Sequence, residues 1–207
     1  RYLIDNNLLH GIEVVNELYY SEEALDIALK NNLTIMGTSD IHGLIDWLFK
    51  VPDDNESENK NLPGHRPITM VFAKSKDKKS IKEALFEGRT AVFYNEMLIG
   101  KEGNLKPLIE KCLVINNVNN LNLGYSEDGE SSIKKIEIEN ISDAPFFLKN
   151  LSDFTFETNS DIITIYPNTK QTIAVRTKGN SLGELKFEVL NGIIAPKKYA
   201  KISLIVK

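Results

Sequence analysis

The hydrophobic and polar positions of the chain follow two different patterns, which change near residue 105. Before this point, short β-branched runs alternate with amphipathic segments. GIEVVN (residues 11–16) and LTIMGTSD (33–40) predict strands on either side of a helix capped by Ser21, an order typical of parallel strands joined by a crossover helix. Two later strands and the helix between them are predicted at residues 67–73, 89–95 and 77–88. The acidic, Asn-rich stretch of residues 50–66 predicts a mobile loop.

After a helix predicted at Leu105 to Cys112, the hydrophobic period becomes two. Apolar residues alternate with polar ones in several short runs, and turn signals such as EDGE, YPNTK and KGNS separate them. This pattern predicts an antiparallel sandwich that resembles the immunoglobulin fold in architecture, without its paired cysteines or core tryptophan. We therefore expect an α/β domain followed by an all-β domain: residues 1–104, and a linker helix with a β-sandwich at residues 105–207.

Composition narrows the classes of function. The 207 residues are 42% hydrophobic and 26% charged, which suits a globular protein with a substantial core, and the net charge of -4 argues against a nucleic-acid partner. The single cysteine, Cys112, excludes an internal disulfide and a thiolate metal cluster. No apolar run approaches the roughly 20 residues of a membrane span, and no signal peptide is visible. Because the chain opens on Arg1, we expect a processed chain or a fragment, and the compartment stays open.

The first candidate for chemistry is TIMGTSDIHG, residues 34–43. If the strand continues to this point, Asp40 and His42 lie on one side of a short extended segment at its carboxyl end, where α/β folds carry their chemistry. A carboxylate and a neutral imidazole are good ligands for zinc, manganese or iron. The alternative is structural: Ser39 or Asp40 caps a short helix at GLIDWLF (43–49), and His42 is exposed. The spacing alone does not decide between them.

GIEVVN, the following helix and GTSDIHG together resemble the end of the PHP (polymerase and histidinol phosphatase) family, whose last motif is D-x-H at the end of a late barrel strand. HRPITMVFAKSKDKKSIKEALFEGRTAVFYN (residues 65–95) is similar to the tail of bacterial PHP-type phosphoesterases that carry an extra C-terminal β domain and are often exported. The resemblance implies the C-terminal portion of a distorted barrel, up to three divalent metal ions, and hydrolysis of a phosphate ester by metal-activated water. Asp40 and His42 match the motif's metal ligands.

The resemblance also implies that this chain holds only part of the site. In the family the other ligands, which include a paired H-x-H, lie on upstream strands, whereas this chain has three histidines in all. His10 precedes its strand and is expected toward the opposite face, while His65 follows the predicted loop. We expect either an upstream N-terminal half of the barrel as partner, with a phosphorylated small molecule as substrate, or a non-catalytic binding or structural module built on the β-sandwich.

Other residues have a functional and a structural interpretation. Glu13 lies mid-strand, where its carboxylate either faces the barrel interior and supports the metal ligands, or takes an edge position or a salt bridge. Arg66 and Arg89 each precede a strand, where a guanidinium could hold a phosphate with two donors or form a surface ion pair. The resemblance runs through HRPIT and so favours Arg66. Trp47 and Phe49 are expected to cover the core.

Overall fold

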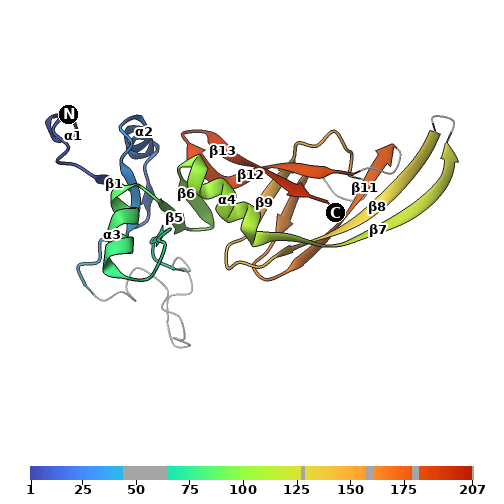
Figure 1. The fold of residues 1–207 in the computed structure, drawn as a ribbon, viewed down its shortest axis with the longest axis horizontal. Coiled ribbons are helices and arrows are strands. Elements are labelled where there is room, and N and C mark those ends of the chain that lie inside the picture. The colour runs from blue at the N-terminus through green and yellow to red at the C-terminus, as the bar shows by residue number, and fades with distance from the viewer. Residues whose placement is uncertain (44–64, 127–128, 157–160, 179–181, 207) are drawn as a thin grey trace. The chain divides into compact units, whose positions relative to one another are not determined.

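The computed structural model describes residues 1–43, 65–126, 129–156, 161–178 and 182–206 (Figure 1). Trp47, Phe49, the predicted helix at GLIDWLF and nearly all of the predicted loop lie outside the described residues. The chain divides into two compact units. The first consists of Arg1–Leu105 with Gly192–Lys198, and the second of Lys106–Asn191 with Tyr199–Lys207.

The first unit contains the predicted strand, helix, strand arrangement. After the short helix α1 (Tyr2–Asp5), strand β1 (Gly11–Asn16) pairs in parallel with β3 (Thr34–Thr38) and antiparallel with the two-residue strand β2 (Tyr19–Tyr20). Helix α2 (Glu22–Lys30) connects β2 to β3, and the Ser21 hydroxyl accepts a hydrogen bond from the Ala24 N–H at 3.1 Å. Parallel pairing brings the carboxyl ends of β1 and β3 to the same edge of the sheet.

A second set of strands in this unit pairs antiparallel. Strands β4 (Ile68–Val71), β5 (Thr90–Tyr94) and β6 (Met97–Gly100) follow one another across the sheet, and Gly192 and Ile193 of β12 (Glu184–Ala195) pair in parallel with β6. Asn95 and Glu96 form the β5–β6 turn with φ of 46° and 66°, the backbone of a type I′ turn, whose handedness suits a two-residue hairpin. The described strands close no barrel, so the partial PHP-type barrel stays a prediction.

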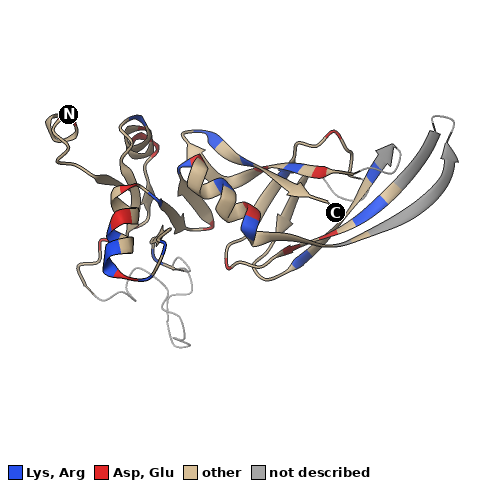
Figure 2. Cartoon of the chain, viewed as in Figure 1, with Lys and Arg blue, Asp and Glu red and all other residues tan. Residues whose placement is uncertain are grey.

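Helix α3 (Lys78–Phe86) lies between β4 and β5 in the chain and carries charges of both signs (Figure 2). Asp77 caps it by accepting a hydrogen bond from the Ser80 N–H at 2.9 Å. The helix ends at Phe86, and two residues later Gly88 has a φ of 65°, in the left-handed region that glycine adopts without steric cost. Both helix boundaries therefore follow from the capping residues in the sequence.

The core of the first unit is built from aliphatic residues of β1, α2, β3, β5 and β6. Its fully buried members are Val14, Val15, Leu25, Ala28, Leu33, Ile35, Val92, Tyr94 and Ile99. On β3, the buried residues give way to half-buried Thr38 and Ser39 and then to exposed Asp40. The hydrophobic core thus fixes the strand while its carboxyl end reaches solvent.

The second unit is a β-sandwich that follows helix α4 (Glu102–Cys112). One sheet has the antiparallel order β11-β8-β7, and in the other β10, β9 and β12 pair antiparallel while β13 pairs with β12. The bounds not yet given are β7 Leu113–Ser126, β8 Gly129–Asn140, β9 Phe146–Asn150, β10 Ile162–Ile165, β11 Lys170–Lys178 and β13 Lys198–Ile205. Alternate residues such as Ile136 and Ile138, or Phe187 and Val189, are buried. This burial matches the period-two pattern of the sequence.

None of the helices in the described ranges is long and apolar enough to cross a membrane.

Candidate metal and phosphate site

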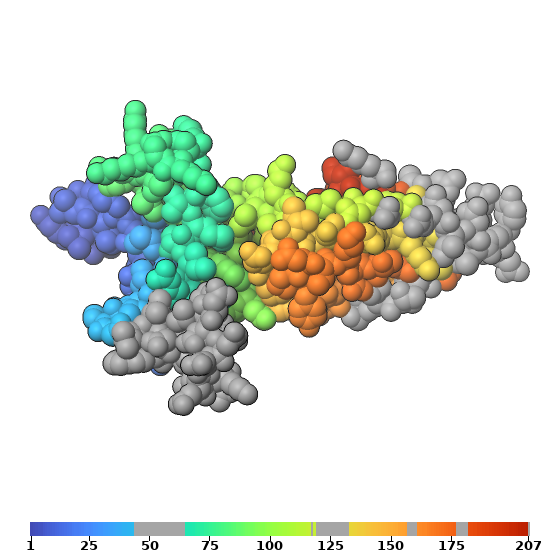
Figure 3. All heavy atoms as spheres, turned by 90° about the horizontal axis from the view of Figure 1, so that it is seen from below, coloured from blue at the N-terminus to red at the C-terminus, as the bar shows by residue number. Residues whose placement is uncertain are grey.

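The carboxyl end of β3 and the start of β4 lie at the surface of the first unit (Figure 3). Strand β3 ends at Thr38, and Asp40 then adopts φ of 46°. Aspartate tolerates this left-handed conformation better than most residues with a side chain, and seven other non-glycine residues of the described ranges adopt it as well. The two helix-capping residues of this unit, Ser21 and Asp77, instead have extended backbones with φ of -112° and -84°. The backbone of Asp40 therefore differs from that of a helix cap.

Asp40 and His42 are brought together by this turn. The Asp40 Oδ1 and His42 Nε2 atoms lie 3.1 Å apart, and the two side chains are 47% and 86% exposed. Ligand atoms about 2.1 Å from one metal ion are about 3 Å apart, because the angle between them at the metal is near 90–110°. In this structure the two groups are hydrogen-bonded, with the imidazole nitrogen donating because a carboxylate only accepts. Both groups have the chemistry of metal ligands, and an ion would bind in place of the shared hydrogen. In the part of the chain that the structure describes, no three His, Cys, Asp or Glu residues gather closely enough to complete a site.

Glu13 contacts the end of β3 from the neighbouring strand. Its Oε1 accepts a hydrogen bond from the Thr38 hydroxyl at 2.9 Å, and its Oε2 accepts one from the Asn16 side chain at 3.0 Å. The register of β1 against β3 shifts between Glu13 and Val15, which marks a bulge at this point. Glu13 thus holds the strand two residues before Asp40, and no salt bridge of its carboxylate is found among the described residues.

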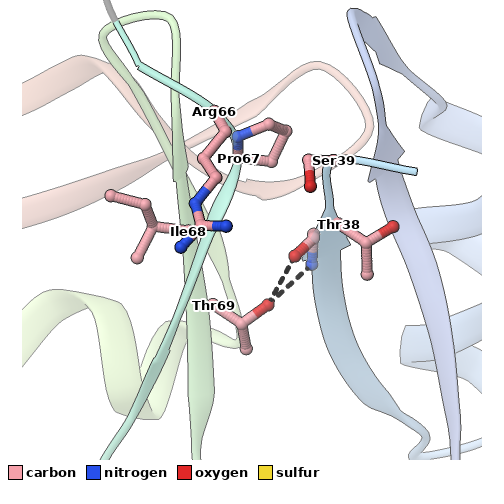
Figure 4. A pocket seen from close by; sticks show the side chains of 7 residues that line it. Thr38, Ser39, Arg66, Pro67, Ile68 and Thr69 are labelled. Carbon is pink, nitrogen blue, oxygen red and sulfur yellow. Dashed lines mark hydrogen bonds between the residues drawn. The ribbon is translucent and has the colours of Figure 1, made fainter. Parts of the chain in front are cut away.

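Arg66 borders an open pocket of about 340 Å³ between the end of β3 and the start of β4 (Figure 4). The pocket is lined by Gly37, Thr38, Ser39, Arg66, Pro67, Ile68 and Thr69. In Figure 4 the Arg66 and Ser39 side chains lie on opposite sides of it, whereas Thr38 points away toward β1. Within the described residues, neither the exposed Arg66 guanidinium nor the Ser39 hydroxyl has a hydrogen-bond or ionic partner. A cationic group and a hydroxyl on two sides of one pocket suit an oxyanion such as phosphate.

Arg89 directly precedes β5, as Arg66 lies two residues before β4, but Arg89 has partners. Its Nη2 lies 3.2 Å from Glu83 Oε1 and its Nη1 lies 3.1 Å from Glu87 Oε2. Its side chain is 25% exposed. The surface ion-pair interpretation therefore applies to Arg89.

Two further residues support the pocket and were not singled out by the sequence. His65 stacks on Phe93 of β5 with ring centroids 4.4 Å apart, and its Nδ1 lies 2.8 Å from the Arg66 carbonyl oxygen. Since a carbonyl only accepts, this nitrogen donates the hydrogen. Thr69 bonds to both backbone polar groups of Gly37. The only sequence signal for His65 was its place beside Arg66, and a threonine within a strand carries no signal of its own.

The remaining histidine, His10, lies at the amino end of β1. Its ring is 4.8 Å from that of Phe86, with the two planes tilted by 48°. It therefore stands at the end of the strand opposite to the candidate site, as the sequence indicated.

The chain is similar to the crystal structure of a two-domain protein containing a predicted PHP-like metal-dependent phosphoesterase from Bacteroides vulgatus ATCC 8482, with 32% sequence identity and a TM-score of 0.78. The similarity covers 99% of this chain and 55% of that protein, so this chain spans about half of its length. A family model described as DUF5001, an Ig-like domain, matches residues 119–205. No curated protein matches. The β-sandwich is thus Ig-like.

Proposed function

We propose that this chain is part of a metal-dependent phosphoesterase in which Asp40 and His42 bind a divalent metal ion. The observation that carries the proposal is that the turn after a parallel strand brings Asp40 Oδ1 and His42 Nε2 into hydrogen-bond contact at 3.1 Å, so that one ion could replace the hydrogen they share. Zinc, manganese and iron all accept this pair of ligands. The likeness to a protein containing a predicted PHP-like metal-dependent phosphoesterase supports the assignment.

Because two ligands do not hold a catalytic ion, the proposal requires others. We assign them to an upstream half of the barrel, which is consistent with the 55% of the similar structure that this chain covers. In this arrangement residues 1–104 form the C-terminal portion of a PHP-like domain, and residues 105–207 form a linker helix and the Ig-like sandwich.

The substrate is a phosphorylated small molecule. Divalent metals supply activation of water and stabilisation of negative charge on a phosphoryl group. Arg66 offers two parallel N–H donors to phosphate oxygens from one side of the pocket, and the Ser39 hydroxyl offers a third from the other side. Glu13 fixes Thr38 by a 2.9 Å hydrogen bond and thereby limits the movement of the Asp40 segment. The chain itself would thus position the phosphate beside its pair of metal ligands.

The test is elemental analysis of a protein that contains the upstream half, together with its hydrolysis of p-nitrophenyl phosphate. We expect bound metal and hydrolysis in the wild type, and lower values of both in His42→Ala and Asp40→Ala. Residues 1–207 alone should bind zinc or manganese weakly and hydrolyse little, because ligands from several strands are required.

The helix-capping interpretation gives a different result for the same variants. Asp40→Ala would cost about 1 kcal/mol of stability, and metal content would not change. Equal metal in the wild type and both variants, with hydrolysis intact, would contradict the proposed metal role. That outcome would favour a binding or structural module built on the Ig-like sandwich.

A further inference from the structure

The edge of β3 that faces away from β1 is held by threonine side chains. On one edge β3 pairs in parallel with β1 through the backbone. Toward β4 and β5, the Thr90 hydroxyl donates to the Ile35 carbonyl oxygen at 2.7 Å, and Thr69 bonds to Gly37. A side-chain hydroxyl thus takes the place of a backbone ladder at each of these two points.

The Thr69 hydroxyl forms two hydrogen bonds with the backbone of a single residue, Gly37. The Gly37 N–H donates to Thr69 Oγ1 at 2.9 Å, and the Thr69 hydroxyl donates to the Gly37 carbonyl oxygen at 2.8 Å, as the dashed lines in Figure 4 show. The hydroxyl uses both its donor and an acceptor position in this way. Although Thr69 lines the pocket, it could donate to a bound phosphate only by releasing Gly37.

The close approach of β5 to β3 depends on the absence of a side chain at Gly37. A Cβ atom there would lie 2.5 Å from Val92 Cγ1 and 3.4 Å from Pro67 Cβ. Pro67 directly follows Arg66, and Gly37 lies three residues before Asp40. The contact between Gly37 and Thr69 is therefore only three residues along the chain from Asp40 on β3's side and from Arg66 on β4's side.

We infer that Thr69 is a positioning residue: by bonding to both backbone groups of Gly37, it sets the separation between the start of β4, which follows Arg66, and the carboxyl end of β3, which leads to Asp40 and His42. The inference rests on the proposed phosphoesterase function. A phosphate held by Arg66 reacts only if it lies at the correct distance from the metal ligands, and a small misplacement of reacting groups lowers the rate strongly. Loss of the Thr69 hydroxyl should thus affect catalysis more than stability alone explains.

The experiment uses the protein with its upstream half and compares Thr69→Val, Thr69→Ser and Thr90→Val. Valine keeps the shape of threonine and removes the hydroxyl, whereas serine retains the hydroxyl. Thr90→Val is the matched control, because it removes another hydroxyl that bonds to β3 but does so two residues farther from Asp40. Hydrolysis of p-nitrophenyl phosphate, bound metal and the midpoint of urea unfolding are measured for each protein.

We expect Thr69→Val to lower kcat/KM by about tenfold or more, with bound metal unchanged. Thr69→Ser should stay within about threefold of the wild type, and Thr90→Val should lower the unfolding midpoint while kcat/KM stays within about twofold. If Thr69→Val does not fold, Thr69→Cys replaces it, and its weaker hydrogen bonds should place its kcat/KM below that of the serine variant.

Equal kcat/KM for Thr69→Val and Thr90→Val, or for the cysteine and serine variants, would overturn the inference while the proposed function stands. A wild-type protein without bound metal or hydrolysis would instead overturn the proposed function, and this inference with it. Bound metal and hydrolysis in the wild-type protein therefore show which of the two, the positioning role of Thr69 or the proposed function, has failed.

Discussion

The start of α3 and the end of β3 each present an aspartate, and the surroundings of the two carboxylates differ. Asp77 accepts hydrogen bonds from the Ser80 N–H and the Ser80 hydroxyl, both at 2.9 Å, and from the Ser75 hydroxyl. Asp40 contacts only the exposed His42 within the described residues. One carboxylate is thus occupied in starting a helix, whereas the other remains able to bind a ligand.

The two arginines repeat this difference. Arg89 has its guanidinium between Glu83 and Glu87, while Arg66 faces an open pocket without a partner in the described ranges. An arginine without an ion pair in these ranges, or an exposed ion pair such as Asp40–His42, contributes little to stability. The comparison teaches that residue type and local sequence position are not enough to assign a role, because the available hydrogen-bonding capacity depends on the neighbours.

The largest effect should separate the two arginines. In the protein with its upstream half, Arg66→Ala should lower kcat/KM by at least about tenfold, equivalent to about 1.4 kcal/mol of transition-state binding. Arg66→Lys should not restore it fully, because lysine lacks the planar pair of donors. Steady-state kinetics with p-nitrophenyl phosphate provide the measurement.

Arg89→Ala is the matched control for this change. It should lower stability by removing the partner of Glu87 and one of the two partners of Glu83, which keeps its 3.0 Å ion pair with Lys74, while kcat/KM stays close to that of the wild type. If Arg66→Ala shows unchanged kinetics, Arg66 belongs with Arg89 among the residues without a role in substrate binding.

A smaller effect should distinguish two serines. Ser21 caps α2 through the Ala24 N–H, so Ser21→Ala should cost about 1 kcal/mol of unfolding free energy. Ser39→Ala should change stability by less than about 0.5 kcal/mol, because its hydroxyl has no partner in the described part of the chain. It should instead raise KM. Urea unfolding and steady-state kinetics are measured for both variants. Equal losses of unfolding free energy and equal KM values for Ser21→Ala and Ser39→Ala would contradict the difference between the two serines.

The smallest effect concerns the charge of Asp77. The hydrogen bonds from the Ser75 hydroxyl and from the backbone and side chain of Ser80 hold the pKa of this carboxyl below its usual range. A lowered folded-state pKa stabilises the fold above the unfolded-state pKa of about 3.9, and the stabilisation is lost as the pH falls through the folded-state value. Asp77→Asn keeps the cap without the charge. The wild type should therefore be more stable than this variant at pH 7, and the urea unfolding midpoints of the two proteins should converge as the pH falls toward 2. A difference between the midpoints that stays constant with pH would show that the charge of Asp77 does not stabilise the fold.

Local patterns predicted the elements that lead to the site. The β-branched run of β1, the cap at Ser21 and the strand that ends before Asp40 are all present, as is the cap at Asp77. Strand β6 was missed because its turn, Asn95 and Glu96, lacks the glycine that usually marks a two-residue hairpin. The ion pair between Arg89 and Glu87 also has a signal in the sequence, because the two residues lie only two positions apart.

By itself the sequence determined the caps, the parallel β1–β3 unit, the alternation of the sandwich and the placement of Asp40 and His42 after a strand. These features depend on residues close together in the chain, whose propensities and periodicity act locally. Only the tertiary structure decided that Arg66 lies across a pocket from Ser39, and that Thr69 bonds to Gly37, 32 positions away. Such contacts depend on how strands β3, β4 and β5 approach each other in space, and Gly37 leaves the room that Val92 of β5 occupies beside β3.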